Sequence, residues 1–217
     1  MCGRFYLNSD IAEIVEQFNA RPPDIFAARY NIAPTTPVLA RTNSALTFFR
    51  WGLIPSWAKD LSMGNRMFNA RSETIAEKPS FRLAYRRRRC LIPANGFYEW
   101  RTENGLKQPY CCHVNHGLFA MAGIWERWQD GDGNHLQTCA VITTEASGAM
   151  RDIHTRMPVP IMPENYDQWL DCRSEKTDIA DQLITEAPEA YACYRVSTAV
   201  NNARHEGSDL IRAIDNP

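Results

Sequence analysis

The sequence predicts an α+β fold in a single domain that spans residues 1–217. A chain of this length can bury one sizeable hydrophobic core. Segments with strand character outnumber segments with helical periodicity, and the two kinds do not alternate as they do in βαβ proteins. We find no linker, internal repeat or low-complexity stretch that would divide the chain.

The first part of the chain is predicted to form short strands around one helix. Asp10 and Glu13 make a capping-box-like start, and the helix is expected to end at Arg21-Pro22-Pro23. An irregular loop is expected over residues 30–34. Strands are predicted over residues 2–7, 37–41 and 46–51, the last two joined by a turn at Asn43-Ser44. Ser72 is expected to cap a short helix that runs to about residue 78.

The rest of the chain is predicted to be mostly strands. The Asn104-Gly105 pair is a strong hairpin signal, and Asp130 to Asn134 forms a second polar turn. Helices are expected over residues 81–89, 163–170 and 175–185, the last with Ile179, Leu183 and Ile184 on one side. Further strands are predicted over residues 90–93, 96–101, 110–114, 119–125, 138–143 and 191–197.

The composition is that of an ordinary globular protein, with 44% hydrophobic and 23% charged residues. Neither an apolar run of about 18 residues nor a signal peptide is present, which predicts an intracellular protein without a membrane span. The seven cysteines form no CxxC pair. We therefore expect free, mostly buried thiols, no metal site and no cofactor.

The positive charge is carried almost entirely by arginine. The formal net charge is -1, with 20 Arg and 4 Lys. Arginine suits bidentate phosphate contacts and stacking on bases, so a basic face for nucleic acid is one interpretation. Genome composition explains the same enrichment. The run from Arg86 to Arg89 is either a phosphate track or a solvated helix end with one Arg turned inward.

The start of the chain, Met1-Cys2-Gly3-Arg4, offers unusual chemistry. A small second residue allows removal of the initiator Met, which would leave Cys2 with an α-amine and a thiol that titrate near ~8 and ~8.5. The amine can condense with an aldehyde, and the thiol can then close a five-membered ring. The simpler alternative is that Cys2 is a small buried residue at a strand start.

Two titratable residues are candidates for proton transfer. Glu99 lies among aromatic residues, which would raise its pKa, although an outward-facing Glu on an alternating strand fits the same pattern. His154 lies in a polar stretch between Asp152 and Arg156 and could be an oriented acid or base. A surface histidine is the alternative.

Two further segments suggest a ligand contact. Asn69 and Arg71 project from one side of an extended segment and could clamp a phosphate or a sugar, or serve as a loop cap and a surface ion pair. Trp51 and Trp57 flank a loop and could stack on unpaired bases. Core packing is the alternative, and it is favoured for Trp51 over Trp57.

In combination and order, these motifs resemble the SRAP family, the SOS-response-associated, abasic-site processing proteins. The resemblance runs from Cys2 to about Leu210. It rests on Met1 to Phe5, Tyr30 to Pro34, Trp51 to Pro55, Asn69 to Thr74, Arg89 to Pro93, Gly96 to Trp100 and Asp152 to Pro158. Met157 departs from the family pattern, which often has Arg before this Pro.

The resemblance implies a curved, barrel-like, mostly antiparallel sheet with flanking helices. It implies that Cys2 forms a thiazolidine with the ring-opened aldehyde of an abasic site in single-stranded DNA, while Asn69 positions the sugar, Glu99 orients the amine and moves protons, and His154 assists ring opening. The DNA-binding residues that it implies are Arg4, Asn31, Pro34, Trp57, Arg71 and Arg156. It also implies a monomer in the cytoplasm, associated with the nucleoid if the source is bacterial.

Two alternative functions remain open. Class II glutamine amidotransferases also begin Met-Cys-Gly, so Cys2, His154 and Asn69 could serve an N-terminal-nucleophile hydrolase or an autopeptidase. The chain could instead bind single-stranded DNA without covalent chemistry.

Overall fold

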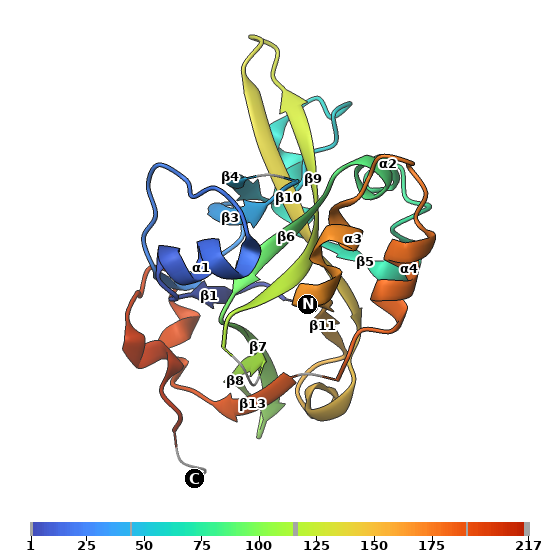
Figure 1. Ribbon diagram of the computed structural model, residues 1–217. Coiled ribbons are helices and arrows are strands. Elements are labelled where there is room, and N and C mark those ends of the chain that lie inside the picture. Colours follow the sequence, from blue (N-terminus) through green and yellow to red (C-terminus); the bar gives the residue numbers. More distant parts are fainter. Residues whose placement is uncertain (1, 44, 115–116, 190, 215–217) are drawn as a thin grey trace.

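The computed structural model describes residues 2–43, 45–114, 117–189 and 191–214. Met1, and Ser44 of the predicted turn, lie outside these ranges. Figure 1 shows a central sheet that curls on itself, with short helices on its outside and a long hairpin projecting at the top.

The central sheet closes into a barrel. Among the described residues, β10, β4, β3, β6 and β9 pair in this order, and β9 pairs with β10 to complete the ring. The bounds are β3 (Pro37–Arg41), β4 (Leu46–Trp51), β6 (Arg89–Ala94), β9 (Phe119–Gln129) and β10 (His135–Glu145). Within the ring the β4–β10 pair is parallel and the other pairs are antiparallel. The barrel-like, mostly antiparallel sheet is therefore confirmed.

Three short strands extend the barrel at one end. Strand β5 (Asn69–Arg71) runs parallel to β10, and β11 (Arg156–Pro158) runs antiparallel to it. Strand β12 (Pro160–Ile161) lies beside β9. Thr143 of β10 has Arg71 as its partner in β5 and Pro158 as its partner in β11. This end of β10 thus brings together two segments that carry candidate site residues.

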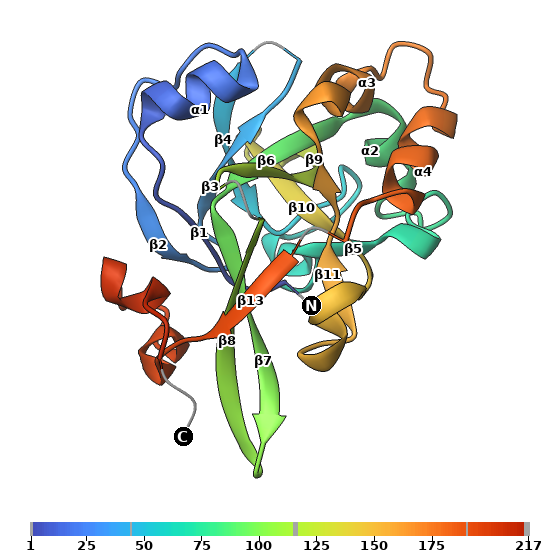
Figure 2. The ribbon, with the colours of Figure 1, turned by 60° about the horizontal axis from the view of Figure 1, so that its bottom comes forward.

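A second sheet packs beside the barrel. Its strands follow the order β13 (Tyr191–Arg195), β8 (Leu106–Val114), β7 (Gly96–Glu103), β1 (Phe5–Leu7) and β2 (Arg29–Ile32). Figure 2 shows the β7–β8 hairpin projecting from the body with β13 alongside it. Asn104 and Gly105 at its tip have φ of 48° and 80°, as the two-residue turn predicted from the sequence requires.

The helices are short and lie outside the barrel. They are α1 (Ile11–Phe18), α2 (Arg82–Arg87), α3 (Tyr166–Leu170) and α4 (Asp178–Thr185). Asp10 caps α1 by accepting a hydrogen bond of 2.8 Å from the Glu13 amide, as predicted. The helix ends before the expected Pro22, because Asn19 adopts a left-handed conformation with φ of 43°.

Two local predictions were wrong. Residues 29–32 form strand β2 instead of an irregular loop, because they pair with β1. Ser72 is the first residue of a 3-10 turn, η2 (Ser72–Thr74), and not the cap of a longer helix. Of the α4 residues predicted to share one side, Ile184 is buried and Ile179 is 54% exposed.

The cysteine prediction was wrong for one pair. Cys112 of β8 and Cys193 of β13 face each other across the second sheet and form a disulfide. The pairing of β8 with β13 brings them together over a sequence separation of 81 residues. Cys2, Cys90, Cys111, Cys139 and Cys172 are free thiols, as predicted.

The arginine run at 86–89 is mainly structural. Arg89 is buried and donates hydrogen bonds to the carbonyl oxygens of Trp169 and Tyr85, at 2.6 and 2.8 Å. Arg88 pairs with Glu126 at 2.6 Å. One arginine of the run therefore does turn inward. Within the described ranges, we find no helix with the length and apolar character that a membrane span requires.

Candidate active site around Cys2

Asn69 joins strand β5 to the start of the chain. Its side-chain amide donates a hydrogen bond of 2.7 Å to the backbone carbonyl of Cys2. Its Oδ1 atom is buried and accepts no hydrogen bond from the described residues. Asn69 therefore fixes the backbone of Cys2 with one end of its amide and presents an acceptor with the other.

Glu99 is buried on strand β7, with only 3% of its surface exposed. Burial raises the pKa of its carboxyl above the ordinary value, and the nearby charge of His154 partly offsets this rise. The alternative of an outward-facing glutamate is therefore wrong. A carboxyl with a raised pKa suits proton transfer near neutral pH.

Cys2 is fully buried and lies within electrostatic reach of Glu99. Burial raises the pKa of its thiol well above the ordinary value, and the negative charge of Glu99 raises it further. Burial therefore favours the protonated form of the thiol. Any reaction at sulfur has to transfer the proton as the new bond forms, which differs from attack by a standing thiolate.

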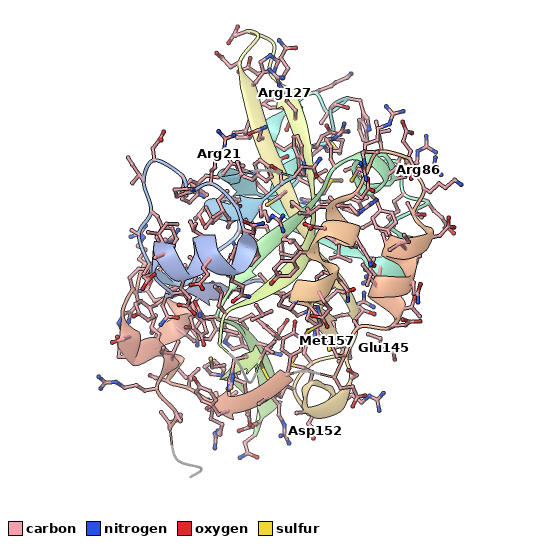
Figure 3. The ribbon with its side chains drawn as sticks, viewed as in Figure 1. Arg21, Arg86, Arg127, Glu145, Asp152 and Met157 are labelled. Carbon is pink, nitrogen blue, oxygen red and sulfur yellow. A yellow bond between two sulfur atoms is a disulfide. The ribbon has the colours of Figure 1, made fainter. Side chains whose placement is uncertain are left out.

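His154 follows the 3-10 turn η3 (Gly148–Asp152), and its orientation is set by backbone groups. Its amide donates to the Met150 carbonyl at 2.9 Å, and its Nδ1 accepts a hydrogen bond of 2.9 Å from the Arg156 amide. Because Nδ1 is an acceptor here, the neutral ring carries its proton on Nε2. Figure 3 shows Asp152, Met157 and Glu145 in the lower part of the molecule, where this segment returns to β10.

These contacts bring the four predicted catalytic residues into one place. Asn69 contacts Cys2, Cys2 interacts with Glu99, and Glu99 interacts with His154. They come from the chain start, β5, β7 and the segment after η3. The arrangement places an amide, a carboxyl and an imidazole around Cys2. If Met1 is removed, the thiol and the α-amine of Cys2 are the candidate nucleophiles.

Two of the predicted DNA-binding residues take part in structural contacts. Arg4 donates to the Asn31 Oδ1 atom at 2.8 Å and to the Val200 carbonyl at 2.9 Å. Asn31 is buried, and its Nδ2 donates to the carbonyls of Asn202 and His205 at 3.0 and 2.9 Å. Together they attach the C-terminal segment to strands β1 and β2. DNA binding by either side chain stays a prediction.

The other predicted DNA-binding residues lie nearer the surface. Trp57 is 58% exposed, whereas Trp51 is buried in the core, as the sequence favoured. The backbone of Gly52, before the Trp57 loop, packs closely against Gly64. Its φ is 133°, and a Cβ at this position would collide with the Gly64 carbonyl oxygen, so glycine is required. Arg71 is exposed and Pro34 is half-buried in a turn.

Arg156 is less available than the sequence suggested. Its guanidinium donates two hydrogen bonds to Glu73, at 2.6 and 2.9 Å, and its side chain is only 14% exposed. Met157, where the family pattern often has Arg, is buried and accepts from the Ser147 hydroxyl at 3.7 Å. In Figure 3, Arg86 lies in the upper right part of the molecule, above Met157 and Asp152.

Two residues of the site were missed at the sequence level. Tyr191 of β13 is buried, its hydroxyl donates to the Pro158 carbonyl at 3.1 Å, and its interaction with Cys2 contributes to a raised pKa that is caused mainly by burial. Glu73 lies within the Asn69 to Thr74 motif, which assigns it no role. No local pattern marks either residue, because their partners lie far away in the sequence.

The described residues contain no group of three or more His, Cys, Asp or Glu side chains that could hold a metal ion. The candidate site accordingly offers an amide, a carboxyl, an imidazole and a thiol as its functional groups.

Comparisons with known proteins identify the family of this chain. The profile of a family described as "SOS response associated peptidase (SRAP)" matches residues 1–203. The chain is 42% identical over 224 residues to the abasic site processing protein YoqW of Bacillus subtilis, covering 98% of this chain and 100% of YoqW. It is 31% identical over 239 residues to the abasic site processing protein HMCES of Rattus norvegicus, covering 90% of this chain and 67% of HMCES.

The fold is also found in solved structures. A crystal structure of a protein from Bacteroides thetaiotaomicron superposes with a TM-score of 0.86 at 26% identity, covering 98% of this chain and 100% of that one. The barrel with its flanking sheet is therefore an arrangement that this chain shares with other proteins.

Proposed function

This chain belongs to the SRAP family, and we propose that it is an abasic-site processing protein that binds single-stranded DNA and forms a covalent crosslink through Cys2. The crosslink is a thiazolidine between Cys2, once Met1 is removed, and the ring-opened aldehyde of the lesion. It shields the lesion from strand cleavage. We expect a monomer that acts in the cytoplasm, at the nucleoid if the source is bacterial.

The chemistry proceeds in two balanced steps. The α-amine of Cys2 adds to the C1′ aldehyde and loses one water to give a Schiff base. The thiol then adds across the C=N bond, with sulfur bonding to C1′ and the thiol proton passing to nitrogen. The raised pKa of the buried thiol supports this order. A protonated sulfur is a poor nucleophile, so it reacts once the Schiff base has placed C1′ next to it.

The surrounding residues have distinct roles in this proposal. Glu99, with its raised pKa, exchanges protons with the amine and orients it. In its protonated form, His154 passes its Nε2 proton to the sugar ring oxygen as the bond between C1′ and that oxygen breaks, and the proton of the C1′ hydroxyl passes to solvent. Asn69 holds the Cys2 backbone and leaves its buried Oδ1 atom for a sugar hydroxyl. The cluster of Cys2, Asn69, Glu99 and His154 is the observation that carries the proposal.

The test uses a single-stranded oligonucleotide with one abasic site and a denaturing gel. Intact mass first establishes that Cys2 is the first residue. We expect a heat-stable shifted band for the native protein and for Cys139→Ala, which removes another buried free thiol, but none for Cys2→Ala. Absence of the band from the native protein contradicts the proposal.

Two other results identify the alternative functions. A shift only under native conditions, with damaged and undamaged strands alike, indicates a non-covalent binding module. Turnover of a glutamine analogue or a peptide indicates an N-terminal-nucleophile hydrolase.

A further inference from the structure

Glu73 and Arg156 form a bidentate ion pair next to the candidate site. The Arg156 nitrogens lie 2.6 and 2.9 Å from the two carboxylate oxygens of Glu73. Arg156 lowers the pKa of Glu73 below its ordinary value, mainly by hydrogen bonding. Two parallel hydrogen bonds fix the relative orientation of the groups, which a single contact between point charges does not.

The backbone of Arg156 in turn orients His154. The Arg156 amide donates to His154 Nδ1 at 2.9 Å, and the Arg156 carbonyl lies 3.3 Å from the same atom. The neutral ring therefore accepts from the amide, and a protonated ring can donate to the carbonyl. In both states the main chain at Arg156 decides where Nε2 points.

The ion pair also crosses the end of β10. Arg71 of β5 and Pro158 of β11 flank the same residue, Thr143. Glu73 lies two residues after Arg71, and Arg156 lies two residues before Pro158, opposite Glu145. Because β5 runs parallel and β11 antiparallel to β10, both side chains reach the same level of β10. The pair thus ties the strand of Asn69 to the segment of His154.

The same pair limits how Arg156 can meet a phosphate. Its terminal nitrogens are directed at Glu73 and at the carbonyl of Thr143. Its Nε atom is buried and donates to no acceptor among the described residues. A phosphate that used this guanidinium would have to displace the Glu73 carboxylate and would then release the restraint on His154.

We propose that Glu73 is a positioning residue for His154, acting through the side chain and backbone of Arg156. The inference rests on the proposed function, in which His154 transfers a proton during crosslinking. Glu73 does not touch the DNA lesion in this proposal. It keeps the Nε2–H of His154 directed at the reacting sugar and opposes the use of Arg156 as a phosphate anchor.

The kinetic test is single-turnover crosslinking at saturating abasic-site strand. We expect Glu73→Gln to slow crosslinking about tenfold, the effect of losing one charge-assisted contact. Its Kd for an undamaged strand should stay unchanged or fall, since a negative charge beside Arg156 is gone. Glu175→Gln is the control, because Glu175 pairs with Arg87 at 2.9 Å with 50% exposure, against 49% for Glu73. The control should crosslink at the native rate.

The decisive comparison is made in a His154→Ala background. If Glu73 acts through His154, Glu73→Gln has no further effect on the crosslinking rate there. An additive loss, an equal loss in Glu175→Gln, or a weaker Kd for undamaged DNA in Glu73→Gln overturns the inference. Thermal unfolding of each variant identifies a loss that comes from misfolding.

A second measurement does not depend on activity. The ¹⁵N shifts of the imidazole nitrogens, assigned by the signal that disappears in His154→Ala, report the tautomer. We expect the Nε2–H form in the native protein and a mixture in Glu73→Gln. If the native protein fails to crosslink but this change occurs, the proposed function fails and the positioning role of Glu73 stands. An unchanged tautomer in Glu73→Gln contradicts the role of Glu73.

Discussion

The side chain of Asn69 donates a hydrogen bond of 2.7 Å to the backbone carbonyl of Cys2, across 67 residues of sequence. Strand β5 carries Asn69 and is held by parallel pairing with β10, so the position of the Cys2 backbone depends on the barrel. The proposed nucleophile is therefore located by a contact to its own main chain, which leaves its amine and thiol for chemistry.

Replacing Asn69 should slow crosslinking without abolishing it. We expect Asn69→Ala to lower the single-turnover rate about tenfold, because one hydrogen bond to the Cys2 backbone and one buried acceptor are lost. Asn65→Ala is the matched control, since Asn65 accepts a hydrogen bond of 2.8 Å from Arg50 on an exposed 3-10 turn (Leu61–Arg66). Equal rates for the two variants would remove Asn69 from the site.

The stability of the protein should depend on pH through Glu99. Burial raises its pKa in the folded state above the unfolded value of about 4.3. The folded state thus holds this proton more tightly, so the stabilisation is complete below the unfolded pKa and is lost as the pH rises through the folded pKa. We expect Glu99→Gln to reduce the fall in Tm between pH 5 and pH 8.

The control for this measurement is Glu175→Gln, which changes an exposed glutamate. It should keep the native pH dependence of Tm. Native and Glu99→Gln proteins with the same dependence would show that Glu99 does not exchange its proton in this range.

Trp57 should contribute to DNA affinity and little to folding. An exposed aromatic ring that stacks on a base is worth about 1–3 kcal/mol, so Trp57→Ala should raise the Kd for single-stranded DNA roughly 5- to 150-fold. Fluorescence anisotropy at fixed salt measures this, with Leu106→Ala as the control at another exposed apolar residue. A Tm loss as large as that of a core substitution would indicate packing instead.

Asn31 should behave as a structural residue. It accepts from Arg4 and donates to the carbonyls of Asn202 and His205, all in a buried position. Asn31→Ala should cost about 3 kcal/mol of the free energy of unfolding, because several buried polar groups lose their partner. Urea denaturation measures this loss.

The same variant also tests the predicted DNA contact. If the folded fraction of Asn31→Ala binds single-stranded DNA with the native Kd, its amide is not a DNA ligand. A weaker Kd with native stability would instead establish the DNA-binding role that the sequence suggested.

Features that depend on local chemistry were predicted correctly from the sequence. Asp10 caps α1, Asn104-Gly105 forms the tip of β7–β8, and residues 37–41 and 46–51 are strands. In each case the residues that determine the conformation lie within a few positions of one another. The unusual chemistry of Cys2 was also visible, since only a terminal cysteine can offer both an amine and a thiol.

Features that depend on distant pairing were not visible in the same way. Residues 29–32 form a strand because they pair with β1. Cys112 forms a disulfide with Cys193 because β8 pairs with β13. Arg156 was predicted to hold a phosphate, yet its guanidinium is engaged by Glu73. A sequence pattern gives residue types along the chain, but these contacts depend on which strands become neighbours.

The sequence by itself determined the α+β class, the boundaries of several strands and the identity of the candidate nucleophile. The tertiary structure decided that the barrel closes through β9 and β10, that Glu99 is buried and that His154 takes its orientation from Arg156. The physical reason is that burial and hydrogen-bond geometry arise only when segments far apart in the chain pack together. A buried carboxyl and an exposed one look the same in the sequence, and only packing distinguishes them.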